Sequence, residues 1–253
     1  TAIDVRRRQR RGEVSTERIV FPDGWAVSRL PAAAGVSPLR VEKLPAARSI
    51  PVPDGKVVVI VNDAQRPTPT PWLMERLDVD WERADVFTAV ATGSHTPPGP
   101  EELKEIFGPF LERIRPRLVL HRGDGSDMIR VGRTGRGTPI EINRHREGSA
   151  SVIALGSVEP HYFAGWTGGR KSLVPGLCSL ATIRANHRLA LEGGRPGSLE
   201  ECPVHHDLVE GAGIIDRWLQ KGGSCLLSAL NVIHREGAFY GSAYGPLASL
   251  VEQ

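Results

Sequence analysis

The sequence has few cysteines, few aromatic residues and no long hydrophobic run. Its three cysteines, Cys178, Cys202 and Cys225, are odd in number, lie far apart and form no CxxC pair. This pattern disfavours a disulfide framework and a thiolate zinc site, and it favours a reducing compartment, so we expect a cytoplasmic protein. No apolar run reaches the roughly 18 residues that a membrane-spanning helix needs. We therefore expect no contact with a membrane.

Several catalytic motifs are also missing. The chain contains no HExxH, no GxSxG and no GxGxxG after a predicted strand. Zinc proteolysis, serine-hydrolase chemistry and ordinary dinucleotide binding thus lose their usual sequence support. The chain also has no strong excess of one charge, because its 32 Lys and Arg residues are nearly balanced by 29 Asp and Glu residues.

Basic residues cluster only near the start of the chain, at Arg6, Arg7, Arg8, Arg10 and Arg11. No aromatic platform accompanies them, so we interpret the cluster as a solvated or subunit-contacting arm and expect no nucleic-acid partner. No apolar segment follows the arginines, which argues against a secretory signal.

The remaining composition is that of a globular protein. The 253 residues, 40% of them hydrophobic, suffice for one large or two small domains. Strands are predicted at residues 56–61, 84–91, 117–120 and 151–155, the first and last of them buried. A hairpin is predicted at 129–133 and 139–142, and helices at 101–107, 179–192 and 204–219, followed by an apolar segment at 225–232. This alternation predicts an α/β fold with an open, mostly parallel, Rossmann-like sheet that has helices on both faces.

Polar clusters follow four of these predicted strands. They contain Asp63 with Arg66, then His95, then His121 with Asp124, and finally His161. In open α/β sheets, ligands bind outside the carboxyl ends of the strands, at the point where the strand order reverses. We therefore expect an active site at this edge, with histidines suited to acid–base chemistry near neutral pH.

Residues 160–172 form the densest polar segment, PHYFAGWTGGRKS. It differs from a phosphate-binding P-loop because Arg170 separates the glycines from Lys171. A glycine-rich turn with a lysine and a serine can still bind an anion through backbone N–H groups. The alternative, a surface loop whose glycines serve turn geometry, stays open on these residues alone.

His187 lies on a helical stripe with Leu180, Ile183 and Leu191, at spacings of three and four residues. The stripe predicts that His187 faces the interior. Two interpretations remain: a satisfied core histidine, or a ligand for a borderline metal such as nickel, copper or zinc.

Four ordered motifs resemble one known family. They are NDAQRPTP at residues 62–69, ATGSHTP at 91–97, the segment from Pro160 to Lys171, and TIRANH at 182–187. Together they resemble the nickel-pincer lactate racemase family over residues 15–220. The resemblance implies an isomerase that racemises or epimerises a small, lactate-like 2-hydroxy acid by proton-coupled hydride transfer.

The resemblance also implies roles for individual residues. Lys171 matches the lysine that holds a nickel pincer nucleotide in covalent linkage, and His187 matches the nickel ligand. His95 and His161 match the acid–base pair that flanks the substrate, and Arg66 matches the arginine that binds its carboxylate. Residues that border this cofactor or contact its phosphate would be Asp63, Thr167, Gly168 and Gly169.

The resemblance further implies a division of the chain. We expect an N-terminal arm with edge elements at residues 1–50 and a cofactor-binding catalytic domain at 51–225. Residues 226–253 would then begin a missing or reduced C-terminal domain, which closes the site in longer family members. Expected partners are the enzymes that make the cofactor and, as an option, a second copy of the chain.

Two alternatives compete with the racemase. One is a domain that binds the nickel cofactor or an anionic metabolite without catalysis. The other is an unrelated metal hydrolase that uses His95, His161 and His187, although no carboxylate completes a recognisable zinc set.

Overall fold

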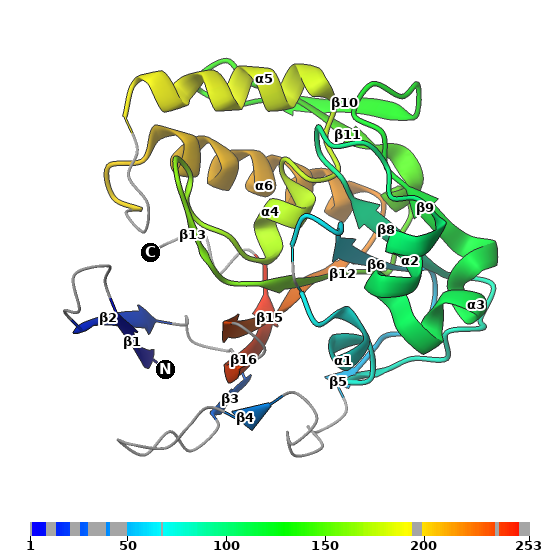
Figure 1. Cartoon of the computed structure of the whole chain (residues 1–253). Helices are drawn as coiled ribbons and strands as arrows, with labels where there is room; N and C mark the ends of the chain where they lie inside the picture. Colours follow the sequence, from blue (N-terminus) through cyan, green and yellow to red (C-terminus); the bar gives the residue numbers. More distant parts are fainter. Residues whose placement is uncertain are drawn as a thin grey trace.

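The computed structural model describes residues 2–8, 14–20, 26–29, 39–40, 50–66, 68–193, 199–235 and 238–247. An eight-stranded sheet forms its centre (Figure 1). Five parallel strands run in the order β15 (Leu226–Arg235), β12 (Ser151–Ser157), β6 (Val57–Asn62), β8 (Val86–Ala91) and β9 (Leu118–Leu120). Beside β15, the antiparallel β16 (Ala238–Pro246) pairs with β3 (Ala26–Arg29) and β4 (Leu39–Arg40).

The sheet is buried on both faces because its strands carry apolar side chains in both directions. In β6, Val57, Val59 and Val61 pack into one hydrophobic cluster, whereas Val58 and Ile60 pack into another on the opposite face. The first cluster includes α1 (Thr70–Met74), α2 (Pro100–Phe107) and α3 (Leu111–Ile114). The second includes α4 (Gly169–Leu173) and α6 (Pro203–Lys221), and α5 (Leu180–Arg188) lies beyond α6 (Figure 1). The predicted fold class is thus confirmed.

Four two-stranded sheets complete the described elements. They are β1 (Ala2–Arg8) with β2 (Val14–Val20), β5 (Ile50–Pro51) with β7 (Leu77–Asp78), β10 (Met128–Arg133) with β11 (Pro139–Asn143), and β13 (Pro160–His161) with β14 (Gly165–Trp166). The β10–β11 pair is the predicted hairpin. Within the basic cluster, Arg6, Arg7 and Arg8 belong to β1, while Arg10 and Arg11 lie outside the described residues.

The helix predicted at residues 179–192 is shorter than expected. Helix α5 ends at Arg188, and a 3-10 helix occupies Leu189–Leu191. Because a 3-10 helix has fewer residues per turn, it rotates Leu191 off the apolar stripe. Leu191 is accordingly 89% exposed, so its predicted place beside His187 on the inner face is wrong.

The central sheet continues across the sequence-based boundary at residue 226. Residues 226–246 form β15 and β16; β15 pairs in parallel with β12 and antiparallel with β16. Residues 248–253 lie outside the described part of the chain.

The strand order reverses between β6 and β12. From β6 the chain proceeds through β8 to β9 on one side, and then returns to place β12 on the other side of β6. Such a switch point opens a crevice at the carboxyl ends of the strands. Among the described residues, no helix has the length and apolar character that crossing a bilayer would require.

Candidate functional site

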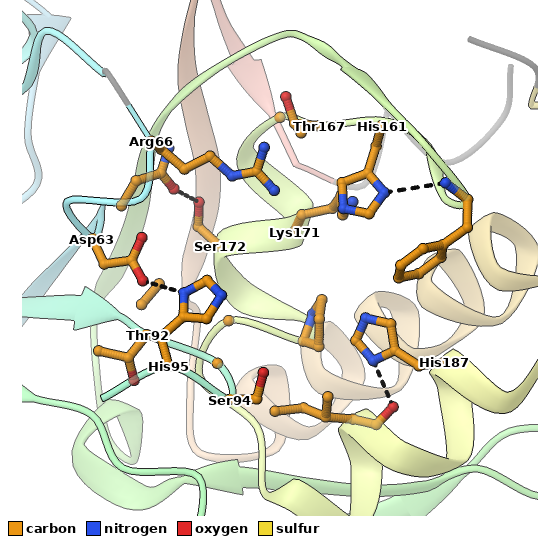
Figure 2. Close-up of a pocket in the computed structure, with 18 of the residues that line it drawn as sticks. Asp63, Arg66, Thr92, Ser94, His95, His161, Thr167, Lys171, Ser172 and His187 are labelled. Atoms are coloured by element: carbon orange, nitrogen blue, oxygen red, sulfur yellow. Dashed lines mark hydrogen bonds and ion pairs between the residues drawn. The ribbon is translucent and has the colours of Figure 1, made fainter. Parts of the chain in front are cut away.

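A cavity of about 420 Å³ lies at this switch point. Its wall contains eight of the nine predicted site residues: Asp63, Arg66, His95, His161, Thr167, Gly168, Lys171 and His187 (Figure 2). They come from the segments after β6, β8 and β12 and from helices α4 and α5. The fold thus brings together residues that are more than a hundred positions apart in the sequence.

Asp63 and His95 form a hydrogen-bonded pair on one side of the cavity. Asp63 follows β6 and is buried, and its Oδ2 lies 2.5 Å from Nδ1 of His95, which follows β8. The backbone N–H of Gln65 donates to the other carboxylate oxygen at 3.2 Å and fixes the carboxylate. When the neutral ring donates its Nδ1 proton to this acceptor, Nε2 keeps its lone pair. His95 is therefore arranged as a proton acceptor.

His161 has the opposite arrangement. Its Nδ1 accepts a hydrogen bond from the backbone N–H of Ala164 at 3.3 Å, so in the neutral ring Nε2 carries the proton. The Tyr162 ring stacks on the imidazole at 4.8 Å. Burial first, and then the positive charges of Lys171 and Arg66, lower the pKa of His161 to about 3. At neutral pH this ring is an uncharged hydrogen-bond donor.

Lys171 contributes a buried amine. Its Nζ atom is inaccessible to solvent and finds no hydrogen-bond partner among the described residues. Burial lowers the pKa of Lys171 to about 6, and the guanidinium groups of Arg170 and Arg66 add to the effect. Arg170 is itself buried, and its Nη2 donates to Nδ1 of His205 at 2.5 Å. A large fraction of Lys171 is therefore neutral at pH 7.

His187 is held by its own helix. Nδ1 donates to the backbone carbonyl of Ile183 at 2.8 Å, which leaves the Nε2 lone pair available on a ring that lines the cavity (Figure 2). Burial lowers the pKa of His187 and keeps the ring neutral. This arrangement is typical of histidines that bind metals.

The described residues contain no group of three or more His, Cys, Asp or Glu side chains that could hold a metal ion. The hypothesis of a metal hydrolase therefore loses its ligand set.

In the glycine-rich turn, Gly168 lines the cavity, whereas Gly169 packs against the central sheet. Gly168 lines the cavity and has a φ of +132°, which side-chain-bearing residues rarely adopt. Thr167 donates through Oγ1 to the carbonyl of Ser157 at 2.8 Å and accepts from the backbone N–H of Glu159. Gly169 does not line the cavity. A Cβ there would lie 2.3 Å from Cβ of Ala229, so its lack of a side chain serves helix–sheet packing.

His121 and Asp124 do not join the site. His121 is fully buried, and its Nε2 lies 3.0 Å from the carbonyl oxygen of Cys178. Asp124 pairs instead with Arg122 on the surface. The expectation that this cluster belongs to the active site is wrong, because β9 is the strand farthest from the switch point among the five parallel strands.

Sequence reasoning assigned no role to the wall residues Asn62 and Phe163, and it considered Ser172 only as part of the glycine-rich turn. Ser172 donates to Oδ1 of Asn62 at 2.9 Å and thereby ties α4 to the end of β6. Phe163 contacts the His187 ring edge-on at 4.9 Å. The available signal was position, since each of these residues lies within two positions of a predicted site residue.

The protein is similar in sequence to known racemases. A model of the lactate racemase N-terminal domain matches residues 37–197. A lactate racemase from Thermoanaerobacterium thermosaccharolyticum is 33% identical over 163 residues, and one from Lactiplantibacillus plantarum is 35% identical over 164 residues. Each match covers 62% of this chain and 38% of the relative.

Solved structures share the fold. The lactate racemase apoprotein from T. thermosaccharolyticum superposes with a TM-score of 0.65 at 24% identity, covering 100% of this chain and 61% of that one. A protein from Thermotoga maritima gives a TM-score of 0.59 at 21% identity, covering 81% and 51%. The chain thus spans 38% of the length of the two curated racemases and 61% and 51% of the two solved structures. Because the family model matches more than half of its residues, the chain belongs to the lactate racemase N-terminal domain family.

Proposed function

We propose that this chain provides the catalytic domain of a racemase or epimerase that acts on a lactate-like 2-hydroxy acid. The observation that carries the proposal is a single cavity containing two histidines whose Nδ1 atoms have opposite kinds of partner, a carboxylate and a backbone N–H, together with an arginine and an unpaired amine. Racemisation needs groups that hold the hydroxyl proton and orient the oxygen while the α-carbon changes configuration.

Arg66 binds the substrate carboxylate in this proposal. Its guanidinium reaches into the cavity opposite His161 (Figure 2). A guanidinium presents two parallel N–H donors that match a planar carboxylate, so it fixes the orientation of the substrate as well as its charge.

His95 and His161 then act on the hydroxyl group. Nε2 of His95 accepts the hydroxyl proton, and the buried Asp63 carboxylate stabilises the imidazolium that forms. His161 donates a hydrogen bond from Nε2 to the substrate oxygen and orients it. His95 returns the proton when the carbonyl is reduced again.

The residues present fit the nickel pincer nucleotide implied by the sequence resemblance. Lys171 has the free lone pair that a covalent linkage requires, and His187 has a free Nε2 for nickel. When bound, this cofactor supplies a hydride acceptor and donor for the substrate α-carbon. Asp63 would border the cofactor, and Thr167 and Gly168 would contact the phosphate of the cofactor. Gly169 would keep the turn packed against the sheet.

The test uses protein co-expressed with the cofactor-synthesis enzymes. We expect a covalent adduct at Lys171 by intact-mass and peptide analysis, stoichiometric nickel by elemental analysis, and exchange of the α-hydrogen of lactate or a larger 2-hydroxy acid. The variant Lys171→Met should lose all three signals. Wild-type protein without an adduct and without nickel would refute the proposal.

A second function rests on the anion-binding groups of the same cavity, Arg66 and the glycine-rich turn, which can hold a ligand without catalysis. The chain could bind the nickel cofactor or an anionic metabolite without turning over a substrate. In that case the same preparation would carry the adduct and nickel but would exchange no α-hydrogen in any 2-hydroxy acid tested.

A further inference from the structure

The environment of Lys171 has a consequence for the protein before any cofactor is attached. Nζ is shielded from solvent, has no hydrogen-bond partner among the described residues and belongs to a side chain that lines the cavity. A primary amine kept neutral by burial and neighbouring cations is a nucleophile at physiological pH, as in enzymes that form Schiff bases with carbonyl substrates.

The same cavity contains the groups that would select and assist a carbonyl partner. Arg66 offers a carboxylate-binding guanidinium, and His161 offers a neutral Nε2–H donor for a carbonyl oxygen. Nε2 of His95 has a lone pair that can accept a proton and pass it on. Asp63 is the only carboxylate among the described wall residues and is engaged by His95, so the cavity favours an anionic ligand.

We infer that the cofactor-free protein captures 2-oxo acids as an imine on Lys171. The Nζ lone pair forms a bond to the carbonyl carbon, and the π electrons of the carbonyl move to its oxygen. His95 carries one amine proton to that oxygen and then the second, so that the hydroxyl leaves as water and a carbon–nitrogen double bond remains. No oxidant or reductant is needed, and the products are one imine and one water.

The imine would regulate cofactor attachment. If Lys171 is the attachment point, as the proposed function holds, the cofactor and a 2-oxo acid compete for one nitrogen atom. A high concentration of 2-oxo acid would then slow loading of new protein, while protein already loaded would be unaffected because its amine is consumed.

The experiment uses the full chain purified without the cofactor-synthesis enzymes. Pyruvate and sodium cyanoborohydride are added at several pH values, and modified lysines are located by peptide mass analysis. We expect Lys171 to be trapped about tenfold faster at pH 7 than the exposed Lys104, which pairs with Glu101, and at a rate that rises through pH 6, because burial lowers the pKa of Lys171 to about 6. Equal modification of both lysines, or no adduct on Lys171, would overturn the inference.

Two variants and one probe sharpen the test. Arg66→Met should lower trapping of pyruvate about tenfold and trapping of acetaldehyde less than twofold, because only pyruvate has a carboxylate that needs a charged partner. Lys104→Arg is the control and should leave the Lys171 adduct unchanged. An Arg66→Met protein that traps pyruvate as fast as wild type would overturn the assignment of 2-oxo acids. The wild-type pH profile tests the inference even if a variant fails to fold.

This result is independent of the racemase proposal. An imine on Lys171 in protein that never accepts nickel would leave the capture of 2-oxo acids standing, but it would refute the proposed function and, with it, the effect on cofactor attachment. If the protein instead binds nickel and is active, but its cofactor-free form gives no adduct with pyruvate, the proposed function stands and the inference is refuted.

Discussion

The two sides of the cavity hold the same kind of side chain in opposite electrostatic surroundings. On one side, His95 is 48% exposed and donates to the buried carboxylate of Asp63. On the other, His161 is partly buried beside Lys171 and Arg66 and accepts from a backbone N–H. One ring is therefore prepared to take up a proton, and the other to remain neutral.

This difference teaches that the surroundings of a histidine, rather than its presence, decide its chemical role. A carboxylate stabilises the imidazolium that forms during proton transfer. Burial among cations penalises that imidazolium, so His161 is better suited to hydrogen bonding than to proton storage. The four predictions below test the contrast, beginning with the largest effect.

Replacing each histidine with asparagine should separate the two roles. In cofactor-loaded protein, His95→Asn should lower α-hydrogen exchange by about 10²–10⁴-fold, because the proton acceptor is lost. His161→Asn should lower it by about 10–100-fold, since an amide still donates a hydrogen bond. His145→Asn, outside the cavity, is the control. Equal losses of α-hydrogen exchange in the His95 and His161 variants would contradict the assignment of different roles to the two histidines.

Asp63→Asn should remove the negative charge that stabilises the imidazolium of His95. We expect about a 10–100-fold loss of exchange, the usual cost of removing a residue that orients a functional histidine. The amide can donate to Nδ1 and so favour the other tautomer of His95, which nitrogen-15 NMR of the ring would detect. Asp124→Asn, whose carboxylate pairs with Arg122 on the surface, should change neither activity nor tautomer.

Lys171→Met should stabilise the cofactor-free protein. Lys171 has a pKa of about 6 when folded and an ordinary value of 10.5, so between these pH values the unfolded chain binds a proton that the folded chain does not. The cost to stability is greatest at pH 6 and below and disappears as the pH rises toward 10.5. We expect the free energy of unfolding to rise on the order of 2 kcal/mol at pH 6 and less at pH 10.

Denaturant unfolding at pH 6, 8 and 10 measures this effect. The control is Lys221→Met, at the exposed end of α6, which should change stability by less than about 0.5 kcal/mol at each pH. A Lys171→Met gain that did not shrink with rising pH would show that packing, rather than the buried amine, accounts for it.

The smallest expected effect comes from adding a carboxylate beside His161. Tyr162 is 75% exposed and stacks on His161, so Tyr162→Glu places a negative charge near that ring. We expect the pKa of His161 to rise by less than about one unit, since solvent screens the new charge. NMR titration of the ring measures the shift, with Tyr162→Gln as the uncharged control. A fall in the pKa would contradict the electrostatic account.

Much of the fold could be predicted from the sequence because parallel, buried strands leave a strong local pattern. The β-branched run at residues 56–61 corresponds to β6, and the strand-end position of Asp63, His95 and His161 located the cavity. These features depend on residues that are neighbours in the sequence, so the pattern alone reveals them.

The sequence-based predictions failed for residues whose role depends on tertiary packing. His121 follows a strand as the other histidines do, but its strand lies far from the switch point, and strand order is not encoded locally. Gly169 resembled a ligand-contacting glycine, whereas contact with Ala229 of β15 explains it. The tautomers of His95 and His161 depend on partners that only the folded chain supplies.

The parallel pairing of β6 with β12 also has a kinetic consequence. Val57 lies opposite Ser151, so the loop that must close before these strands can pair spans more than ninety residues. Such non-local pairing makes folding slow, because chain entropy is lost before the contacts are gained. The cavity lies between these two strands, so it and its reactive amine form only once the strands have paired. Nascent or partly folded chains would present Lys171 as an ordinary, protonated lysine, and only completed folding would make it reactive.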